Sequence, residues 1–517
     1  MSRKSGVFLN VSSLPSPFGI GVFGREAKIW IDSLEESGFG IWQVLPFNPI
    51  GCGNSPYASP SAFAGNVLYI DPRVLAEAEL LTYNEVVESF YHGSPYTVDY
   101  GFATEKKEFL LRRAFSRADT ALLEKVRKFG EDNKHIKDYA LFLVAKKHND
   151  DKPWWLWGRE YDYKNAVEIE KLYYDEVMYH LFCQYLFFEQ WAEIKAYANK
   201  KGIEVFGDMP IYVSQDSADV WTDSKQFLLD EKTKLPTDVA GVPPDFFSPD
   251  GQLWGNPLYD WETMEKDGFK WWRERIEGNL RLYDIVRIDH FRAFASYYAI
   301  PYGAETAKEG EWREGVGFKF FEALADVMDK DKIIAEDLGT FGEDVVKLLE
   351  DTGFPGMRVV QFGMAFDEES THTPHNCNEN CVAYLGTHDN NTLLGWLFEI
   401  DERERDYVLA YCAADKNGWD VGGYKAPACR RIIETVWRSG AKIAMISFQD
   451  ICGFGADARM NTPGTAEGNW CFRATEENIE SYDKGYYKWI NFVFRRLNQL
   501  LVEKKTDETA EDKESDK

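Results

Sequence analysis

Eight short apolar runs recur along the chain, and most of them end in polar or acidic residues. A nearly continuous apolar run of this length is typical of a parallel strand that is buried on both faces of its sheet. The runs therefore predict eight buried strands, at residues 6–10, 41–46, 203–210, 285–291, 333–338, 357–362, 382–389 and 441–450.

Helix-like segments separate many of these runs. A repeated alternation of strand and helix indicates a parallel α/β fold. Eight units whose strands end in polar residues favour a closed barrel over an open sheet, because barrel active sites gather at the carboxyl ends of the strands. The predicted fold class is α/β, a (β/α)8 TIM barrel with large inserted subdomains on the catalytic face. The helices are expected at residues 24–38, 179–200, 318–328, 343–352 and 426–439.

We interpret residues 1–503 as a single catalytic barrel with two insertions. The second and third runs are separated by more residues than one crossover helix needs. Residues 71–175 are charged and helix-prone, which predicts a helical insertion. Residues 504–517 carry mixed charge without a large apolar side chain, which predicts a disordered acidic tail.

A second insertion is expected at residues 222–268, which are rich in Pro, Gly and Asp. Long loops of this composition are often lids over an active site. The apolar side chains of Phe246, Phe247, Leu253 and Trp254 favour an ordered, partly buried lid.

The charge of the chain excludes several classes of partner. Asp plus Glu total 86 against 59 Lys plus Arg, which gives a formal charge of −27. Such a surface repels nucleic acid and anionic membranes, so a neutral substrate such as a sugar is favoured. We expect no signal peptide and no membrane span, because the chain has no long uncharged apolar stretch.

Six of the eight cysteines are scattered, which favours a reduced, cytoplasmic protein over a disulfide-stabilised one. Cys377 and Cys381 are spaced as a C-x3-C pair, with His372 and His375 just upstream, so zinc must be considered. A second Cys/His pair does not follow at a suitable distance, and we therefore expect no metal site.

The segment VRIDHFR carries the strongest chemical signal. Arg287 and Asp289 share one face of a strand because side chains alternate along it. The arginine should keep the carboxylate ionised, as a nucleophile requires, although a purely structural ion pair fits the same pattern.

In IIAEDLG, Glu336 and Asp337 close another apolar strand. Burying two acids is costly unless they line a cleft or take part in chemistry. A glutamate shielded from water has a raised pKa, which suits a general acid.

Two further acids follow predicted strands. Asp389 lies beside His388 in GTHDNNT, and Asp208 closes VFGDMP. A Ser-His-Asp triad would need a G-x-S-x-G elbow, which the chain lacks. Acids at four strand ends, with His290 and His388 beside two of them, fit glycosidic bond cleavage, which needs a proton donor and a second carboxylate. The residues themselves predict a glycosidase-type barrel.

A set of motifs in the same order resembles the 4-α-glucanotransferases, also called amylomaltases or disproportionating enzymes, of glycoside hydrolase family 77. RIDH and AED are shared with the wider α-amylase clan, whereas the whole set between Val7 and Arg473 is specific. The motifs are SPYASPSAFAGN, FGDMPIYVSQDSADVW, VPPDFFSPDGQLWGNPLYDW, VRIDHFR, AEDLG, FPGMRVVQFG, PHNC, GTHDNNT and RMNTPGT.

The resemblance implies a role for each acid of the set. Asp289 matches the nucleophile, Glu336 the general acid/base and Asp389 the carboxylate that stabilises the transition state. It implies no cofactor. It also implies substrate contacts at Tyr57, Tyr100, Asp208, Trp254, Asn256, Pro257, Arg287, His290, His388, Asn461 and Pro463. Two positions depart from the family pattern: Cys377, where an aromatic residue is expected after PHN, and the two Asn residues between GTHD and Thr392. Neither belongs to the carboxylate set, so they bear on fine substrate preference and not on catalysis.

The expected function is transfer of α-1,4-glucan segments between maltooligosaccharides by a retaining double displacement. The alternative is an α-glucan hydrolase of the α-amylase clan. A non-catalytic glucan-binding scaffold would have lost one of the three acids, and a phosphate-handling barrel would want a Gly-rich loop and basic site residues. α-1,4-Glucans and maltooligosaccharides are the expected partners, and the sequence indicates no protein partner.

Overall fold

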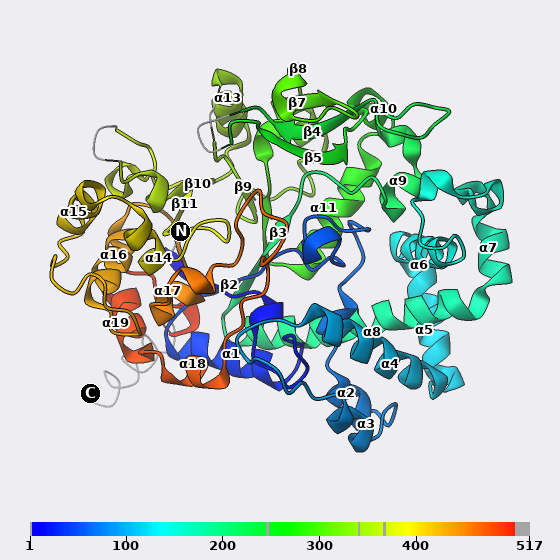
Figure 1. Ribbon diagram of the computed structural model, residues 1–517, viewed down its shortest axis with the longest axis horizontal. Coiled ribbons are helices and arrows are strands. Elements are labelled where there is room, and N and C mark those ends of the chain that lie inside the picture. The colour runs from blue at the N-terminus through cyan, green and yellow to red at the C-terminus, as the bar shows by residue number, and fades with distance from the viewer. Residues whose placement is uncertain (1–2, 245–247, 340–341, 366–368, 502–517) are drawn as a thin grey trace, which may run out of the picture.

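Eight parallel strands form a nearly closed barrel in the part of the chain that the structure describes (Figure 1). The computed structural model describes residues 3–244, 248–339, 342–365 and 369–501. In the order in which they neighbour one another, the strands are β10 (Gly356–Val359), β11 (Cys381–Tyr384), β12 (Ile443–Ser447), β1 (Lys4–Phe8), β2 (Ile41–Gln43), β3 (Glu204–Met209), β6 (Ile285–Ile288) and β9 (Ile333–Ala335). Each predicted run overlaps one of these strands, so the predicted barrel is confirmed.

Alternation of side chains along the strands builds the barrel interior in layers. Asp208, Arg287 and Glu336 each come two residues after a side chain of the apolar layer on β3, β6 or β9. The same alternation therefore turns them inward. The polar rim is therefore the next layer of the same packed interior. The apolar layer is one cluster of buried side chains, formed by Ile41, Phe206, Ile285, Ile334, Met357, Val359, Val382, Tyr384, Ile443 and Met445.

The seam between β9 and β10 is closed by a side chain. Backbone pairing between described strands runs from β10 round to β9, and Ala335 N donates to Pro355 O across the remaining gap at 2.9 Å. The buried Asp337 carboxylate adds to this contact, because it accepts from Met357 N at 2.5 Å and from Arg358 Nη1 at 2.7 Å. Two adjacent acids thus face opposite ways: Glu336 lies at the rim, and Asp337 joins two strands.

Replacing Asp337 by Ala is expected to lower the free energy of unfolding by about 3 kcal/mol, because the Met357 N–H and the Arg358 guanidinium lose a buried acceptor. Denaturant unfolding measures the change. The matched control is Asp351→Ala, which removes an exposed helical pair with Lys347 at 2.6 Å and should cost at most about 0.5 kcal/mol. Equal losses in the two variants would contradict the role of Asp337 at the seam.

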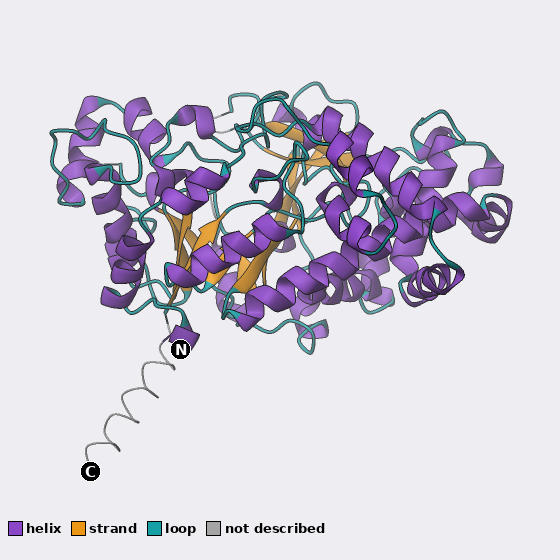
Figure 2. Ribbon diagram, turned by 90° about the horizontal axis from the view of Figure 1, so that it is seen from below, coloured by secondary structure: helices purple, strands orange, loops and turns teal. Residues whose placement is uncertain are grey.

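Helices surround the strands (Figure 2). The structure bears out the predicted helices as α1 (Arg25–Glu36), α8 (Tyr174–Lys200), α13 (Glu343–Thr352) and α16 (Pro427–Arg438). In the described residues, none of the helices has both the length and the apolar character needed to cross a membrane.

The helix predicted at residues 318–328 is shorter than expected, because α12 ends at Ala323. The Arg273 guanidinium donates a hydrogen bond to the Ala323 carbonyl oxygen at 3.0 Å. In a continuing α-helix this oxygen would accept from Val327 N. Val327 N instead bonds to Leu324 O at 3.0 Å, so the chain goes on as turns.

Six helices lie between β2 and β3 in addition to α8, among the described residues. They are α2 (Pro72–Glu77), α3 (Tyr83–Glu88), α4 (Tyr100–Ser116), α5 (Thr120–Asp132), α6 (Lys134–Lys147) and α7 (Ala166–Leu172). Figure 1 shows α4 to α7 beside the barrel, at the right of the view, and α2 and α3 below it.

Residues 222–268 are more regular than the predicted loop, because they contribute two strands to an antiparallel sheet. Its order is β5 (Gln252–Pro257), β4 (Asp238–Val242), β7 (Ser296–Pro301) and β8 (Glu311–Glu314). This sheet lies apart from the barrel strands, at the top of Figure 1. Phe246, Phe247 and the predicted tail lie outside the described residues.

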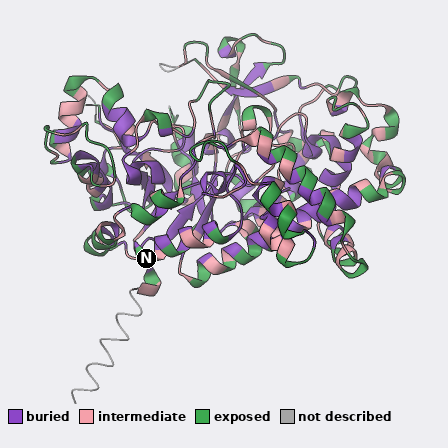
Figure 3. Cartoon of the chain, turned by 60° about the horizontal axis from the view of Figure 1, so that its bottom comes forward, coloured by how far each residue is buried: buried purple, intermediate pink, exposed green. Residues whose placement is uncertain are grey.

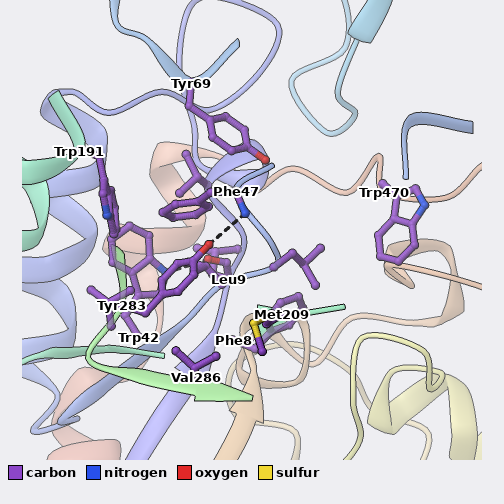
Figure 4. Close-up of a cluster of buried hydrophobic side chains, with 14 of the residues drawn as sticks. Phe8, Leu9, Trp42, Phe47, Tyr69, Trp191, Met209, Tyr283, Val286 and Trp470 are labelled. Carbon is purple, nitrogen blue, oxygen red and sulfur yellow. Dashed lines mark hydrogen bonds between the residues drawn. The ribbon is translucent and has the colours of Figure 1, made fainter. Parts of the chain in front are cut away.

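Aromatic side chains pack the barrel against its helices, and the buried residues concentrate around the central strands (Figure 3). Phe47 and Trp191 meet edge to face at 4.5 Å, and Phe47 N donates to the Tyr283 hydroxyl at 3.0 Å (Figure 4). Trp191 Nε1 in turn donates to Leu282 O at 3.0 Å. These contacts tie α8 to the loop after β2, and the buried polar atoms of the rings are satisfied.

Candidate active site

A buried arginine gathers three carboxylates at the carboxyl end of the barrel. Arg287 Nη1 lies 2.5 Å from Asp208 Oδ2, and Arg287 Nη2 lies 2.8 Å from Asp289 Oδ1. The same Nη2 lies 4.0 Å from Glu336 Oε2. The oxygens of Asp289 and Glu336 near this nitrogen are therefore no more than about 7 Å apart, a range that includes the spacing of the two acids in retaining glycosidases. The structure thus brings together the acids that the sequence placed at separate strand ends.

Two backbone N–H groups hold the Glu336 carboxylate. Leu338 N donates to Oε1 and His290 N to Oε2, each at 2.7 Å. His290 has a φ of 49°, in the left-handed region that side chains other than glycine rarely adopt. This strained backbone aims the His290 N–H at the acid, and strain of this kind concentrates at functional sites.

Burial raises the pKa of Glu336, while Arg287 and the two backbone donors oppose that shift. Burial also raises the pKa of Asp289, and repulsion from Asp208, Glu336 and Asp389 adds to it against the pull of Arg287. We expected Arg287 to keep Asp289 ionised, and this expectation is wrong. Desolvation and the neighbouring acids raise the pKa of Asp289 by more than the shared Arg287 lowers it.

The Asp389 side of the site is joined to Asp208 through an aromatic bridge. The Tyr57 hydroxyl donates to Asp208 Oδ2 at 2.6 Å and lies 3.0 Å from His388 Nε2. His388 Nε2 is also 3.4 Å from Asp389 Oδ2, and Asn461 Nδ2 donates to Asp389 Oδ1 at 2.6 Å. These contacts place five of the predicted residues in one network.

A family profile for 4-alpha-glucanotransferase matches residues 9–478. The chain belongs to the 4-alpha-glucanotransferase family. A 4-alpha-glucanotransferase of Clostridium butyricum is 41% identical over 476 residues, which cover 90% of this chain and 96% of that protein. The chloroplastic/amyloplastic enzyme of Solanum tuberosum is 40% identical over 484 residues, with 91% and 82% covered. An amylomaltase from Streptococcus agalactiae, solved in complex with acarbose, superposes with a TM-score of 0.90 at 36% identity and covers 96% of this chain and 100% of its own.

The site of this 4-alpha-glucanotransferase family member also contains Trp470, which the sequence did not single out. Its ring lies 5.7 Å from that of Tyr57 and 5.8 Å from that of His388. The Tyr100 hydroxyl donates to the Trp470 carbonyl at 2.9 Å, so Tyr100 lies behind this tryptophan in the structure. No local pattern marks Trp470, because its partners come from distant segments.

Arg459, which begins the RMNTPGT motif, is a second site residue outside the predicted substrate contacts. Its guanidinium donates to Asp389 O at 2.6 Å and to Asn461 O at 2.7 Å. Arg459 therefore fixes the backbone on both sides of the Asn461–Asp389 hydrogen bond. Pro463, two residues after Asn461 in the same loop, is exposed.

Those predicted lid residues that the structure describes lie along β5. The Trp254 ring is 38% exposed and meets the His290 ring edge to face at 4.9 Å. Asn256 Nδ2 donates to Val213 O at 2.8 Å, and the buried Pro257 pairs with Val239 of β4. Trp254 thus reaches the catalytic rim, whereas Asn256 and Pro257 anchor the strand that carries it.

The cysteine and histidine motif near residue 377 has a structural arrangement. His372 Nδ1 accepts from Val359 N at 3.1 Å at the end of β10, and His375 Nδ1 lies 2.8 Å from the Tyr411 hydroxyl. Cys377 and Cys381 are buried free thiols. Within the described ranges, no group of three or more His, Cys, Asp or Glu side chains is arranged to hold a metal ion.

Proposed function

We propose that this protein transfers α-1,4-glucan segments from a maltooligosaccharide, starch or glycogen donor to the 4-hydroxyl of an acceptor glucan or glucose. The observation that carries this proposal is the joining of Asp208, Asp289 and Glu336 around the Arg287 guanidinium. Membership of a family whose reported members are named as transferases supports transfer over the α-amylase type of hydrolysis.

The proposed reaction is a double displacement with retention of configuration. A carboxylate oxygen of Asp289 attacks the anomeric carbon while Glu336 gives its proton to the departing glycosidic oxygen. The glycosyl-enzyme is then attacked by the 4-hydroxyl of the acceptor, whose proton passes to Glu336. Asp289 leaves as a carboxylate, so the enzyme returns to its starting state.

The surroundings of the two acids support this division of roles. The Asp289 side chain is 27% exposed and lies 2.8 Å from Arg287, whereas the Glu336 side chain is 10% exposed and 4.0 Å from it. Arg287 therefore stabilises a charge on Asp289 more directly than a charge on Glu336, which suits a nucleophile. The less exposed Glu336 suits the acid, because burial raises its pKa.

The other predicted residues are proposed to bind the glucan. Asp389, oriented by Asn461 and close to His388, would stabilise the positive charge that develops on the donor sugar. Tyr57 and Asp208 would bound the donor site through their hydrogen bond. Further proposed contacts are Tyr100, Trp254, Asn256, Pro257, Arg287, His290 and Pro463.

Residues 71–175 and 222–268 are proposed to be insertions in one catalytic barrel that spans residues 1–503. A reducing, cytoplasmic setting is supported by the eight cysteines, which are free thiols in the described part of the chain.

Incubation with maltotriose tests the proposed function. A transferase is expected to yield glucose together with a ladder of oligosaccharides longer than the substrate, which chromatography separates. The Asp289→Asn variant serves as the control for contaminating activity. A product mixture that contains only glucose and maltose would establish hydrolysis instead.

Trp254→Ala is expected to raise the ratio of hydrolysis to transfer, because the ring would no longer help to exclude water from the glycosyl-enzyme. Loss of an aromatic contact worth about 1 kcal/mol predicts a change of roughly two- to tenfold. Released glucose and the total of transfer products, measured together, give the ratio. Tyr302→Ala, an exposed position just after β7 of the same sheet, is the control and should leave the ratio unchanged. An unchanged ratio of hydrolysis to transfer in Trp254→Ala would show that Trp254 on β5 does not help to exclude water.

A further inference from the structure

A small cavity lies directly beneath the catalytic rim. Its volume is about 10 Å3, and its polar lining comes from Gln43, Arg287, Tyr384, Thr387 and His388, with apolar walls that include Met357. Gln43, Arg287 and Tyr384 project from β2, β6 and β11, which are separate strands of the barrel. These three side chains are buried, and His388 joins the cavity to the catalytic rim.

Each of these three side chains has a buried polar atom without a hydrogen-bond partner among the described residues. The atoms are Arg287 Nε, Tyr384 Oη and Gln43 Oε1; the Gln43 side chain lies near the Tyr384 hydroxyl, but the two are not in hydrogen-bonding geometry. A buried polar atom without a partner costs about 1–3 kcal/mol, and native proteins rarely leave several together. Two donors and one acceptor converging on one cavity therefore indicate a bound polar ligand.

We propose that the cavity binds one ordered water molecule, which accepts hydrogen bonds from Arg287 Nε and Tyr384 Oη and donates one to Gln43 Oε1. A volume of about 10 Å3 is at the lower limit that holds a single water. Three polar partners match the usual coordination of a buried water. Burial raises the pKa of Tyr384, so its hydroxyl stays protonated and remains a donor.

The charges around the cavity exclude an ion as the ligand. The guanidinium of Arg287 is already paired with Asp208 and Asp289, so it has no unmatched charge to attract an anion. The Gln43 carbonyl oxygen would repel an anion, and the guanidinium would repel a cation.

The water completes the hydrogen bonding of the catalytic arginine. Nη1 is bound to Asp208, Nη2 to Asp289, and the water holds Nε. A planar guanidinium that is held on each of its three nitrogens cannot rotate. Gln43 and Tyr384 are accordingly positioning residues: they act on Asp289 through the water and Arg287.

Crystal structures of the full chain at about 2 Å resolution or better test the site directly. The wild type is expected to show a density peak within about 3 Å of Arg287 Nε, Tyr384 Oη and Gln43 Oε1. The peak should weaken or vanish in Tyr384→Phe and persist in Met357→Leu, a volume-conserving change in the apolar wall. A wild-type cavity without density, or with density that Tyr384→Phe leaves intact, would overturn the proposal.

The pH dependence of kcat/KM tests the anchoring role, and this arm rests on the proposed function. Arg287 lowers the pKa of Asp289, so a less firmly held guanidinium should raise that pKa. Because the nucleophile must be ionised, the acidic limb of Tyr384→Phe should move to higher pH by about half a unit, while Met357→Leu stays at the wild-type position. An unmoved limb in a variant that has lost the water would refute the anchoring role. Absence of glucan transfer by the wild type would instead refute the proposed function and leave the crystallographic result standing.

Discussion

Asp289→Asn is expected to abolish both transfer and hydrolysis, with kcat on maltotriose lowered by about 10⁵- to 10⁶-fold. The amide cannot form the covalent ester with the anomeric carbon, and every later step depends on that intermediate. Initial rates of glucose release and of longer products, followed with concentrated enzyme, measure the loss.

The fold of this variant should be retained, because the introduced asparagine side chain is nearly the same size as the aspartate and stays close to Arg287. A thermal unfolding midpoint near that of the wild type separates loss of chemistry from loss of structure. Asp351→Asn, at an exposed position of α13, is the matched control and should keep full activity. Turnover of Asp289→Asn within tenfold of the wild type would reject Asp289 as the nucleophile.

Glu336→Gln is expected to lower kcat on maltotriose by about 10²- to 10⁴-fold, the range for loss of a general acid. With an α-maltotriosyl fluoride donor the first step should be largely restored, because fluoride leaves without a proton. The covalent intermediate should then accumulate and be detected by mass spectrometry, since no base remains to activate the acceptor. Azide, a nucleophile that needs no deprotonation, should release it as a glycosyl azide.

The pH profile gives a second readout for Glu336. Burial raises its pKa, and the acid is needed in its protonated form, so wild-type kcat should fall as the pH rises through that pKa. The alkaline limb should be lost in Glu336→Gln acting on the fluoride. Equal losses on maltotriose and on the fluoride, with an unchanged alkaline limb, would assign the proton transfer to another residue.

The strands and the acids at their ends were predictable because both signals are local. A parallel strand buried on both faces must be apolar over its whole length, and the chemistry of a barrel follows where that run stops. The same pattern does not say where each acid points. Asp450 also closes a predicted strand, yet its Oδ1 accepts from Leu393 N at 2.6 Å, at the start of α14 (Leu393–Glu399).

The aromatic part of the site was not predictable from local pattern. Tyr57, His388 and Trp470 stand far apart in the chain, and ordinary core packing explains each ring equally well until their contacts are known. The lid was predicted from composition, but its pairing as β4 and β5 depends on β7, which follows the catalytic strand β6.

The sequence by itself determined the barrel, its eight strands, the candidate acids and the family resemblance, because these follow from residue types in fixed local order. Only the tertiary structure decided how neighbouring acids are used: Glu336 faces Arg287, whereas Asp337 closes the seam to β10. It also decided that several carboxylates share Arg287 and that Asp289 is buried. Burial raises the pKa of Asp289, and the attraction of the shared arginine only partly offsets that rise. The physical reason is the same in each case. The direction and desolvation of a side chain depend on the register between strands that lie far apart in the sequence.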